Sequence, residues 1–202
     1  MKIVGLICAG LLAGAPVLSA VAECASDEEV AAFVQAHSEK TPAKALGAGG
    51  TMEDAVCTQE KLRVALSEKL GPVIGYKAGL TAPATQERFG VSEPVHGVLY
   101  RDMMLENPAT VPVDFGVRPL FEADLILVIG DAAINKATTP EEAIRHISEV
   151  RPFIELPDLM LAEGEPMTGE TLTAMGVAPR LGVLGEAIPV DDPDAMLKRW
   201  PR

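Results

Sequence analysis

Three carboxylates in this sequence stand inside apolar runs, where a lone acidic side chain is costly to bury. Glu122 and Asp124 interrupt the run from Leu120 to Ile129, and Glu155 stands alone in the run from Phe153 to Leu156. If the first run is a β-strand, Glu122 and Asp124 share one face and lie about 6.6 Å apart along it. Two like charges on an apolar face need a positive partner, because burying them together otherwise costs several kcal/mol.

A hard divalent cation is the simplest partner for these three acids. Mg²⁺ takes oxygen ligands at about 2.0–2.1 Å, and three carboxylates from two strands leave further coordination positions for water and substrate. We therefore predict a metal site at Glu122, Asp124 and Glu155. The alternative is that the acids are solvated at a sheet edge or pair with arginines, of which the sequence offers three candidates: Arg118, Arg145 and Arg151.

Lys77 is the fourth residue that could take part in chemistry. It is the only charged residue between Val73 and Leu80, and its strand face also carries Gly75 and Gly79, which leave space for another group. An ammonium group at this point could hold a substrate carboxylate or stabilise an enolate as its charge develops. The alternative is that Lys77 only neutralises one of the acids.

The composition excludes several classes of protein. The chain has 202 residues, of which 48% are hydrophobic, and its 17 Lys+Arg against 29 Asp+Glu give a net charge of −12. This acidic balance argues against nucleic-acid binding, because phosphate contacts need a basic face. The apolar content is too high for a disordered chain and suits one compact domain.

The first 22 residues have the pattern of a cleaved export signal. Lys2 precedes an uncharged apolar stretch, Ile3 to Leu18, and Ala20 to Ala22 supplies small residues before a cleavage site. We expect residues 1–22 to be removed, no membrane anchor to remain, and the rest of the chain to be periplasmic in a bacterium. There Cys24 and Cys57 either form a bridge that closes a loop of about 34 residues or stay unpaired.

Two helices are expected at the start of the remaining chain. A capping box opens a helix from Ser26 to about His37, a linker follows up to residue 50, and a second helix runs from Thr51 to Gly71. We therefore divide the chain into a signal at 1–22, an N-terminal helix and linker at 23–50, and a domain at 51–202.

Strands dominate the rest of the chain. Apolar runs bounded by turn residues predict strands over 73–80, 96–104, 120–129, 153–156 and 181–184. Cap residues predict a brief helix from Thr81, a helix from Thr139 to Val150, and a short last helix from Asp192 to Trp200. Helices followed by strands with little alternation indicate an α+β fold.

Four short motifs follow one another between Thr51 and Gly185. They are Gly75-Tyr76-Lys77-Ala78-Gly79-Leu80-Thr81, Glu93-Pro94 with Gly97-Val98-Leu99-Tyr100, Glu122-x-Asp124, and Phe153-Ile154-Glu155. In this order they resemble the 2-keto-4-pentenoate hydratases and related 2-oxo-3-hexenedioate decarboxylases of the fumarylacetoacetate hydrolase superfamily. The ordered series is far more specific than any single motif.

The resemblance implies a rolled, mixed β-sheet with N-terminal helices, and a lyase that adds water to a conjugated double bond of a 2-hydroxydienoate or 2-oxo acid. In that family Mg²⁺ or Mn²⁺ is held by an E-x-E pair and a later glutamate, which fall on Glu122, Asp124 and Glu155, with aspartate where glutamate is usual. The family's active-site lysine falls on Lys77. The expected partner is a small-molecule acid, and the oligomeric state stays open, a homo-oligomer included.

Three departures from the family pattern bear on activity. Val95 and His96 stand where many members have an active-site Asp before an aromatic residue, so His96 becomes a candidate acid or base. Ala174 to Ala178 replaces a polar Asp-Asn segment. The sequence ends at Arg202, where members continue with strands that complete the roll, so the second half of the roll is expected to be missing. The alternatives to an active lyase are a noncatalytic periplasmic domain that binds 2-oxo acids and an inactive truncated homologue.

Overall fold

The structure is a computed structural model that describes residues 23–199. The expected signal at 1–22 and Trp200, at the expected end of the last helix, lie outside the described residues. The α-helices are α1 (Asp27–Glu39), α2 (Met52–Leu70), α3 (Pro83–Phe89), α4 (Pro140–Ala143), α5 (Gly169–Ala174) and α6 (Pro193–Arg199). Shorter 3-10 helices lie at Arg101–Met103, Ala132–Lys136 and Ile144–His146.

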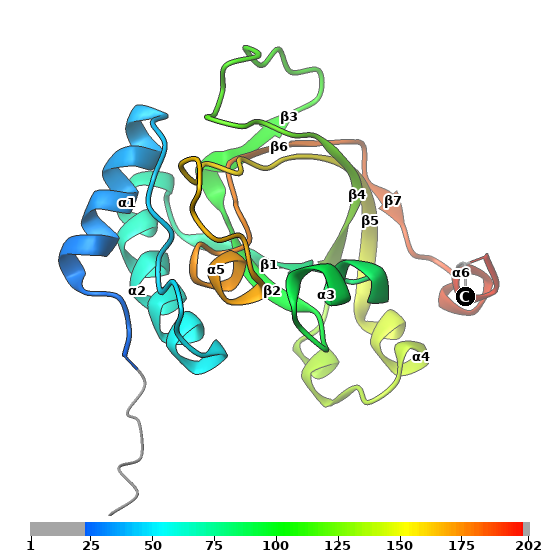
Figure 1. The fold of residues 1–202 in the computed structure, drawn as a ribbon. Helices are drawn as coiled ribbons and strands as arrows, with labels where there is room; N and C mark the ends of the chain where they lie inside the picture. The colour runs from blue at the N-terminus through cyan, green and yellow to red at the C-terminus, as the bar shows by residue number, and fades with distance from the viewer. Residues whose placement is uncertain (1–22, 200–202) are drawn as a thin grey trace, which may run out of the picture.

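The strands form two sheets. They are β1 (Val73–Gly79), β2 (Val95–Tyr100), β3 (Met104–Glu106), β4 (Glu122–Ile129), β5 (Ile147–Leu156), β6 (Leu181–Leu184) and β7 (Ile188–Pro189). β1 pairs with β2 in a small antiparallel sheet, and the larger sheet has the order β3-β6-β5-β4, with β7 also paired to β5. Because β3 and β6 are parallel and the other pairs antiparallel, the larger sheet is mixed. The larger sheet is visibly curved in Figure 1, and the expected α+β fold with a mixed, rolled sheet is confirmed.

Both N-terminal helices begin at the capping boxes that the sequence contains. The Ser26 hydroxyl accepts from the Glu29 amide, while the Glu29 carboxylate accepts from the Ser26 amide, and Thr51 and Asp54 do the same at α2. A disulfide joins Cys24 to Cys57, with the two Cα atoms 5.4 Å apart. This link ties the segment before α1 to α2 and stabilises the fold by roughly 3–4 kcal/mol in the chain-entropy picture.

The main hydrophobic core lies between α1, α2, α5 and the small sheet (Figure 1). Its centre contains Phe33 of α1, Leu62 and Leu66 of α2, Tyr100 of β2 and Met175 after α5, all at most 4% exposed. Burial of each such side chain contributes about 1.5–3 kcal/mol. The core therefore fixes β1 and β2, and with them Lys77, against the two long helices.

One predicted helix is wrong. The helix expected from Thr139 to Val150 lasts a single turn as α4, a 3-10 turn follows, and β5 already begins at Ile147. Ile144, Ile147 and Val150 have helical spacing, but Val150 lies opposite Leu127 of β4 and is buried there. Pairing with β4 and β7 thus outweighs the local periodicity.

The face of β4 that carries Leu125, Leu127 and Ile129 is apolar and partly exposed. β4 is the last strand of the larger sheet on its side, among the residues that the structure describes. None of the described helices is both long and apolar enough to cross a bilayer.

Candidate active site

The register of β4 and β5 brings the three predicted metal ligands to one face of the larger sheet. Glu122 lies directly opposite Glu155 in the antiparallel pair, and Asp124 lies opposite Phe153, one same-face position further along. Side chains that are opposite each other, or two residues apart on one strand, point to the same side of a sheet. The sequence pattern placed Glu122 and Asp124 together, and the strand pairing adds Glu155.

Glu155 is the buried member of this set. Its residue is 3% exposed, whereas Glu122 and Asp124 are exposed at the start of β4. Burial raises the pKa of the Glu155 carboxyl, and the nearby Glu122 and Asp124 carboxylates raise it further, while Lys77 acts against the shift. The group of three acids thus favours an additional positive charge on this face.

Lys77 supplies part of that charge from the other sheet. Its ammonium group pairs with the Glu155 carboxylate, and its Nζ also donates to the Val177 carbonyl oxygen at 2.9 Å. Only about a tenth of the Lys77 side chain is exposed. An ammonium group has three N–H donors, so two are used by the protein and one remains for another acceptor.

The loop that supplies the Val177 carbonyl has an unusual backbone. Val177 and Ala178 have φ of 60° and 55°, in the left-handed region that β-branched and other non-glycine residues rarely adopt. Such a conformation costs roughly 1–3 kcal/mol per residue and persists only where the surroundings hold it. The contacts around this segment must therefore hold it in place.

Two glycines let the loop come close to Lys77. A Cβ atom on Gly97 would lie 2.2 Å from the Gly176 carbonyl oxygen, and a Cβ atom on Gly79 would lie 2.6 Å from Cγ1 of Val177. Both contacts are far below ordinary van der Waals separation. The bare backbone at Gly97 and Gly79 is therefore what allows the loop to pack onto the β1–β2 sheet.

His96 does not join these residues. In the pairing of β1 with β2, Lys77 lies opposite Gly97, whereas His96 lies opposite Ala78. Neighbouring residues on a strand point to opposite faces, so the exposed His96 imidazole is on the other side of the small sheet from Lys77. The predicted role of His96 as an acid or base for the same substrate is not supported by this placement.

A second buried polar cluster adjoins the site and was missed in the sequence. The Arg180 guanidinium lies 3.8 Å from the Asp158 carboxylate, and these two residues are 7% and 2% exposed. The Asp158 carboxylate also accepts from the amides of Val117 and Arg118. Asp158 directly follows Pro157, and Arg180 directly follows Pro179. A charged residue next to a proline was the feature of the sequence that could have pointed to this cluster.

His37 completes this cluster. Its carbonyl oxygen accepts from Arg180 Nη1 at 2.6 Å, and its ring Nε2 lies 3.4 Å from the carbonyl oxygen of Pro179. Burial, together with the positive charge of Arg180, lowers the pKa of His37 from 6.5 to about 4. The imidazole is therefore neutral at pH 7 and donates to Pro179 when Nε2 carries the proton.

The donor set agrees with a divalent metal in kind and in charge. The three carboxylates are hard oxygen donors on one face, and none forms an ion pair with an arginine among residues 23–199. In this conformation the three carboxylates do not converge on one point, because the described residues contain no group of three acidic, histidine or cysteine side chains placed to hold a metal ion. One Asp124 oxygen accepts from the Leu125 amide. Rotation of exposed side chains is thus needed for joint coordination.

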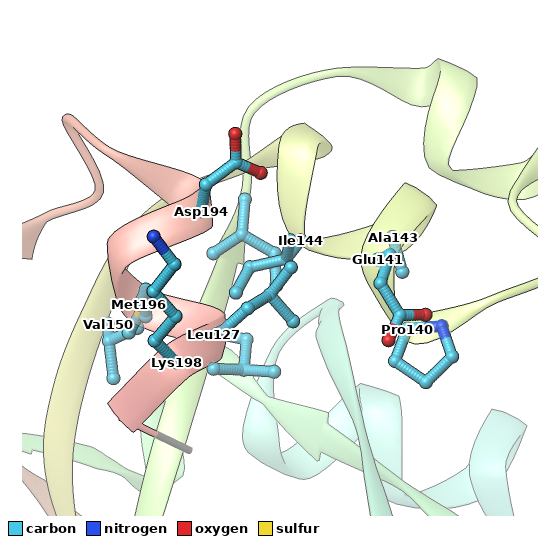
Figure 2. Close-up of a pocket in the computed structure, with 11 residues that line it drawn as sticks. Leu127, Pro140, Glu141, Ala143, Ile144, Val150, Asp194, Met196 and Lys198 are labelled. Carbon is cyan, nitrogen blue, oxygen red and sulfur yellow. The ribbon is translucent and has the colours of Figure 1, made fainter.

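A large cavity among the described residues lies elsewhere, on the far side of the larger sheet. It has a volume of about 900 Å³ and lies between β4, β5, the α4 region and α6, with Leu127, Ile144, Val150 and Met196 in its lining. Figure 2 shows Leu127 and Ile144 beside the α6 helix, which itself carries Asp194, Met196 and Lys198. Leu127 points away from the face that carries Glu122 and Asp124. The cavity is therefore distinct from the carboxylate site.

Comparison with known proteins shows what this chain is similar to in sequence. No family model matches the chain. Over 115 residues it is 29% identical to a 2-keto-4-pentenoate hydratase of Paraburkholderia xenovorans, covering 55% of this chain. It is 28% identical over 108 residues to a 4-oxalocrotonate decarboxylase of a Pseudomonas species. The chain is a relative of these hydratases and decarboxylases. The resemblance seen in the ordered motifs is thereby confirmed.

A solved structure is similar to this chain at the level of the fold. The 4-oxalocrotonate decarboxylase of Pseudomonas putida G7, complexed with magnesium and adipate, matches with a TM-score of 0.69 at 19% identity, covering 82% of this chain and 64% of that one. The two curated relatives are matched over 42% of their own length. The hydratase and decarboxylase relatives are thus longer than the stretch they share with this chain.

Proposed function

We propose that this protein is a divalent-metal-dependent, hydratase-like lyase that acts on 2-hydroxydienoate or 2-oxo acids. The observation that carries the proposal is the common face of Glu122, Asp124 and Glu155, with the Lys77 ammonium group beside it. The hydratase names of the relatives and the magnesium in the decarboxylase structure support it.

Each residue of the site has a definite part in this proposal. Glu122, Asp124 and Glu155 would hold Mg²⁺ or Mn²⁺, which, when bound, supplies positive charge that stabilises an enolate. Lys77 keeps one free N–H donor after its bonds to Glu155 and Val177, and we assign that donor to the substrate carboxylate or to proton transfer. The net reaction adds water across the conjugated double bond of the substrate.

A noncatalytic domain that binds 2-oxo acids is the second candidate. It is favoured by the position of His96 on the other face, which leaves Lys77 as the one titratable base or acid seen beside the carboxylates in residues 23–199. Such a domain binds the same acid without converting it. Its signature is a ligand-dependent rise in melting temperature without any change in the absorbance of the substrate.

Export from the cytoplasm is a separate proposal. It rests on the signal-like residues 1–22 and is supported by the Cys24–Cys57 disulfide, because structural disulfides persist in oxidising compartments. Expression in a bacterium and amino-terminal sequencing of the periplasmic fraction tests it. A mature chain that begins near Glu23 is expected, whereas an intact Met1 in the cytoplasmic fraction contradicts it.

Ultraviolet absorbance of a conjugated 2-hydroxydienoate tests the catalytic proposal directly. We expect the absorbance to fall with Mg²⁺ or Mn²⁺ present, and to stop falling after exhaustive chelation or in Glu122→Ala. Glu141→Ala removes an exposed carboxylate beside the far cavity and serves as the matched control. Full activity after chelation contradicts the proposal, as does full activity of Glu122→Ala.

A further inference from the structure

Lys77 is held by two acceptors that come from distant parts of the chain. The Glu155 carboxylate belongs to β5, and the Val177 carbonyl belongs to the loop after α5. Three residues beyond each acceptor stands one member of the buried ion pair, Asp158 after Glu155 and Arg180 after Val177. The ion pair thus joins the two segments on which the position of the Lys77 ammonium group depends.

We infer that Arg180 is a positioning residue for Lys77. Arg180 fixes the segment from Ala178 to Arg180, and this segment holds in place the Val177 carbonyl that binds the Lys77 ammonium group. As far as catalysis is concerned, the inference rests on the proposed function. Arg180 does not itself reach the Lys77 ammonium group. It acts through the backbone that connects it to Val177.

Every residue of the segment after Val177 is anchored. The Asp158 amide donates to the Ala178 carbonyl at 3.2 Å, and the His37 ring lies within hydrogen-bond distance of the Pro179 carbonyl. Arg180 donates from Nη1 to the His37 carbonyl and from Nε to the Phe115 carbonyl at 3.0 Å. Buried polar groups with partners on several elements have little freedom to move, so the segment is fixed in its position.

The local sequence does not account for the backbone of Val177 and Ala178. Gly176, two residues after the end of α5, has a left-handed conformation, and the Val177 amide donates back to the Leu172 carbonyl, as is common at helix ends. That motif needs one left-handed residue, and here two more follow it. A valine and an alanine do not adopt this conformation unaided, so the anchored segment beyond them must impose it.

The protected ammonium group of Lys77 gives a readout that does not depend on turnover. Lysine N–H protons exchange slowly enough to give a ¹H–¹⁵N NMR signal when they are buried and hydrogen-bonded, and Lys77→Met assigns the signal by its loss. In Arg180→Met we expect this signal to disappear while the protein still melts cooperatively. We also expect kcat to fall about tenfold or more, with a smaller change in KM, because a small displacement of a reacting group is costly.

Two further variants separate positioning from general damage. Arg118→Met removes a neighbouring, exposed arginine that bonds to the Leu159 carbonyl but does not anchor residues 178–180, and it should keep the signal. Adding Val177→Gly and Ala178→Gly to Arg180→Met should restore the signal and bring kcat to within about threefold of the parent, since glycine adopts the left-handed conformation without the anchor. General damage to the core is not repaired by such glycines.

The outcomes decide between the inference and its alternatives. A Lys77 signal that survives in folded Arg180→Met overturns the inference, and so does a failure of the glycine pair to restore it. If Arg180→Met does not melt cooperatively, Val177→Gly and Ala178→Gly are introduced together into the unmodified chain. Loss of the Lys77 signal in that variant overturns the inference. A retained signal with an unchanged or higher melting temperature supports it. If the unmodified chain shows no turnover with any 2-oxo acid, the proposed function fails, while the NMR readout still tests the position of Lys77.

Discussion

Glu122 and Glu155 face each other directly across β4 and β5, and the cation beside them is a lysine from the other sheet. Lys77 can pair fully with one carboxylate, and within residues 23–199 no cationic side chain pairs with Glu122 or Asp124. The site therefore has an excess of negative charge that a divalent ion can balance. This relationship supports the metal-dependent proposal over a purely structural ion pair.

Removal of Lys77 should destabilise the metal-free protein. Lys77→Met leaves the Glu155 carboxylate buried beside two other acids, and breaking a buried pair in this way costs about 3–5 kcal/mol. The free energy of unfolding, measured with urea in the presence of a chelator, should fall by about that amount. The double variant Lys77→Met with Glu155→Gln should regain much of the loss, because no charge then stays buried.

Lys61→Met is the control for the Lys77 variant. Lys61 pairs with Asp27 at the surface, where solvent screens the interaction, so little change in stability is expected. Equal decreases in unfolding free energy in Lys61→Met and Lys77→Met would show that the buried Lys77–Glu155 pair contributes no more to stability than the surface pair. Millimolar Mg²⁺ should recover part of the stability of Lys77→Met but not of Lys61→Met.

The neutral His37 ring makes stability depend on pH. Its pKa is about 4 in the folded state and 6.5 in an unfolded chain, so the unfolded chain binds the proton more strongly. The contribution of the neutral ring is complete above pH 6.5 and is lost as the pH falls through 4. The loss in unfolding free energy between pH 7 and pH 4 amounts to about 3 kcal/mol. His37→Gln retains a donor for Pro179 but does not titrate, so its unfolding free energy should fall less between pH 7 and pH 4 than that of the parent chain.

The parent chain and His37→Gln contain the same carboxylates, so the contribution of these acids to the pH dependence of stability cancels when the two chains are compared. Denaturant unfolding at pH 7, 5.5 and 4.5 is the measurement. Parallel curves for the parent and His37→Gln over this interval would show that the ring is not held neutral by burial and Arg180.

Gly97 is expected to tolerate no side chain. In Gly97→Ala the new Cβ atom meets the Gly176 carbonyl oxygen, a backbone atom that cannot rotate away, so the loop must shift from the small sheet. Overpacking of this kind costs typically 1–3 kcal/mol. We expect a lower unfolding free energy and loss of the contact between Lys77 and the Val177 carbonyl.

Gly75→Ala is the matched control for that substitution. It lies on the same sheet, and its added Cβ atom would meet Leu99 Cδ1 at 3.6 Å, an ordinary contact. Thermal melts of the two variants should therefore differ clearly. Similar melting temperatures would mean that the loop moves away from Gly97 at little cost.

Helices and strands that are bounded by clear cap or turn residues could be predicted from the sequence. α1 and α2 begin at capping boxes, and β4 lies within an apolar run that stops at Gly130. Local residues therefore decide the positions of these elements. β5 was predicted too short because Ile147 and Val150 fit a helix as well as a strand. Only the partner strands settle that ambiguity.

The site could be predicted in part for the same reason. Alternation along one strand puts Glu122 beside Asp124, but no local pattern shows that Glu155 lies opposite Glu122 or that His96 faces away from Lys77. The Val177 carbonyl is 100 residues from Lys77 in the sequence, and a backbone acceptor has no residue type to recognise. Contacts of this kind depend on tertiary packing alone.

The bond between Cys24 and Cys57 has a consequence for a chain that is cut by a protease. Cleavage at any peptide bond between those two cysteines, including the glycine-rich stretch at 47–50, leaves both fragments covalently attached. A nicked molecule therefore keeps α1 on the core and migrates as one species in a gel until a reducing agent is added.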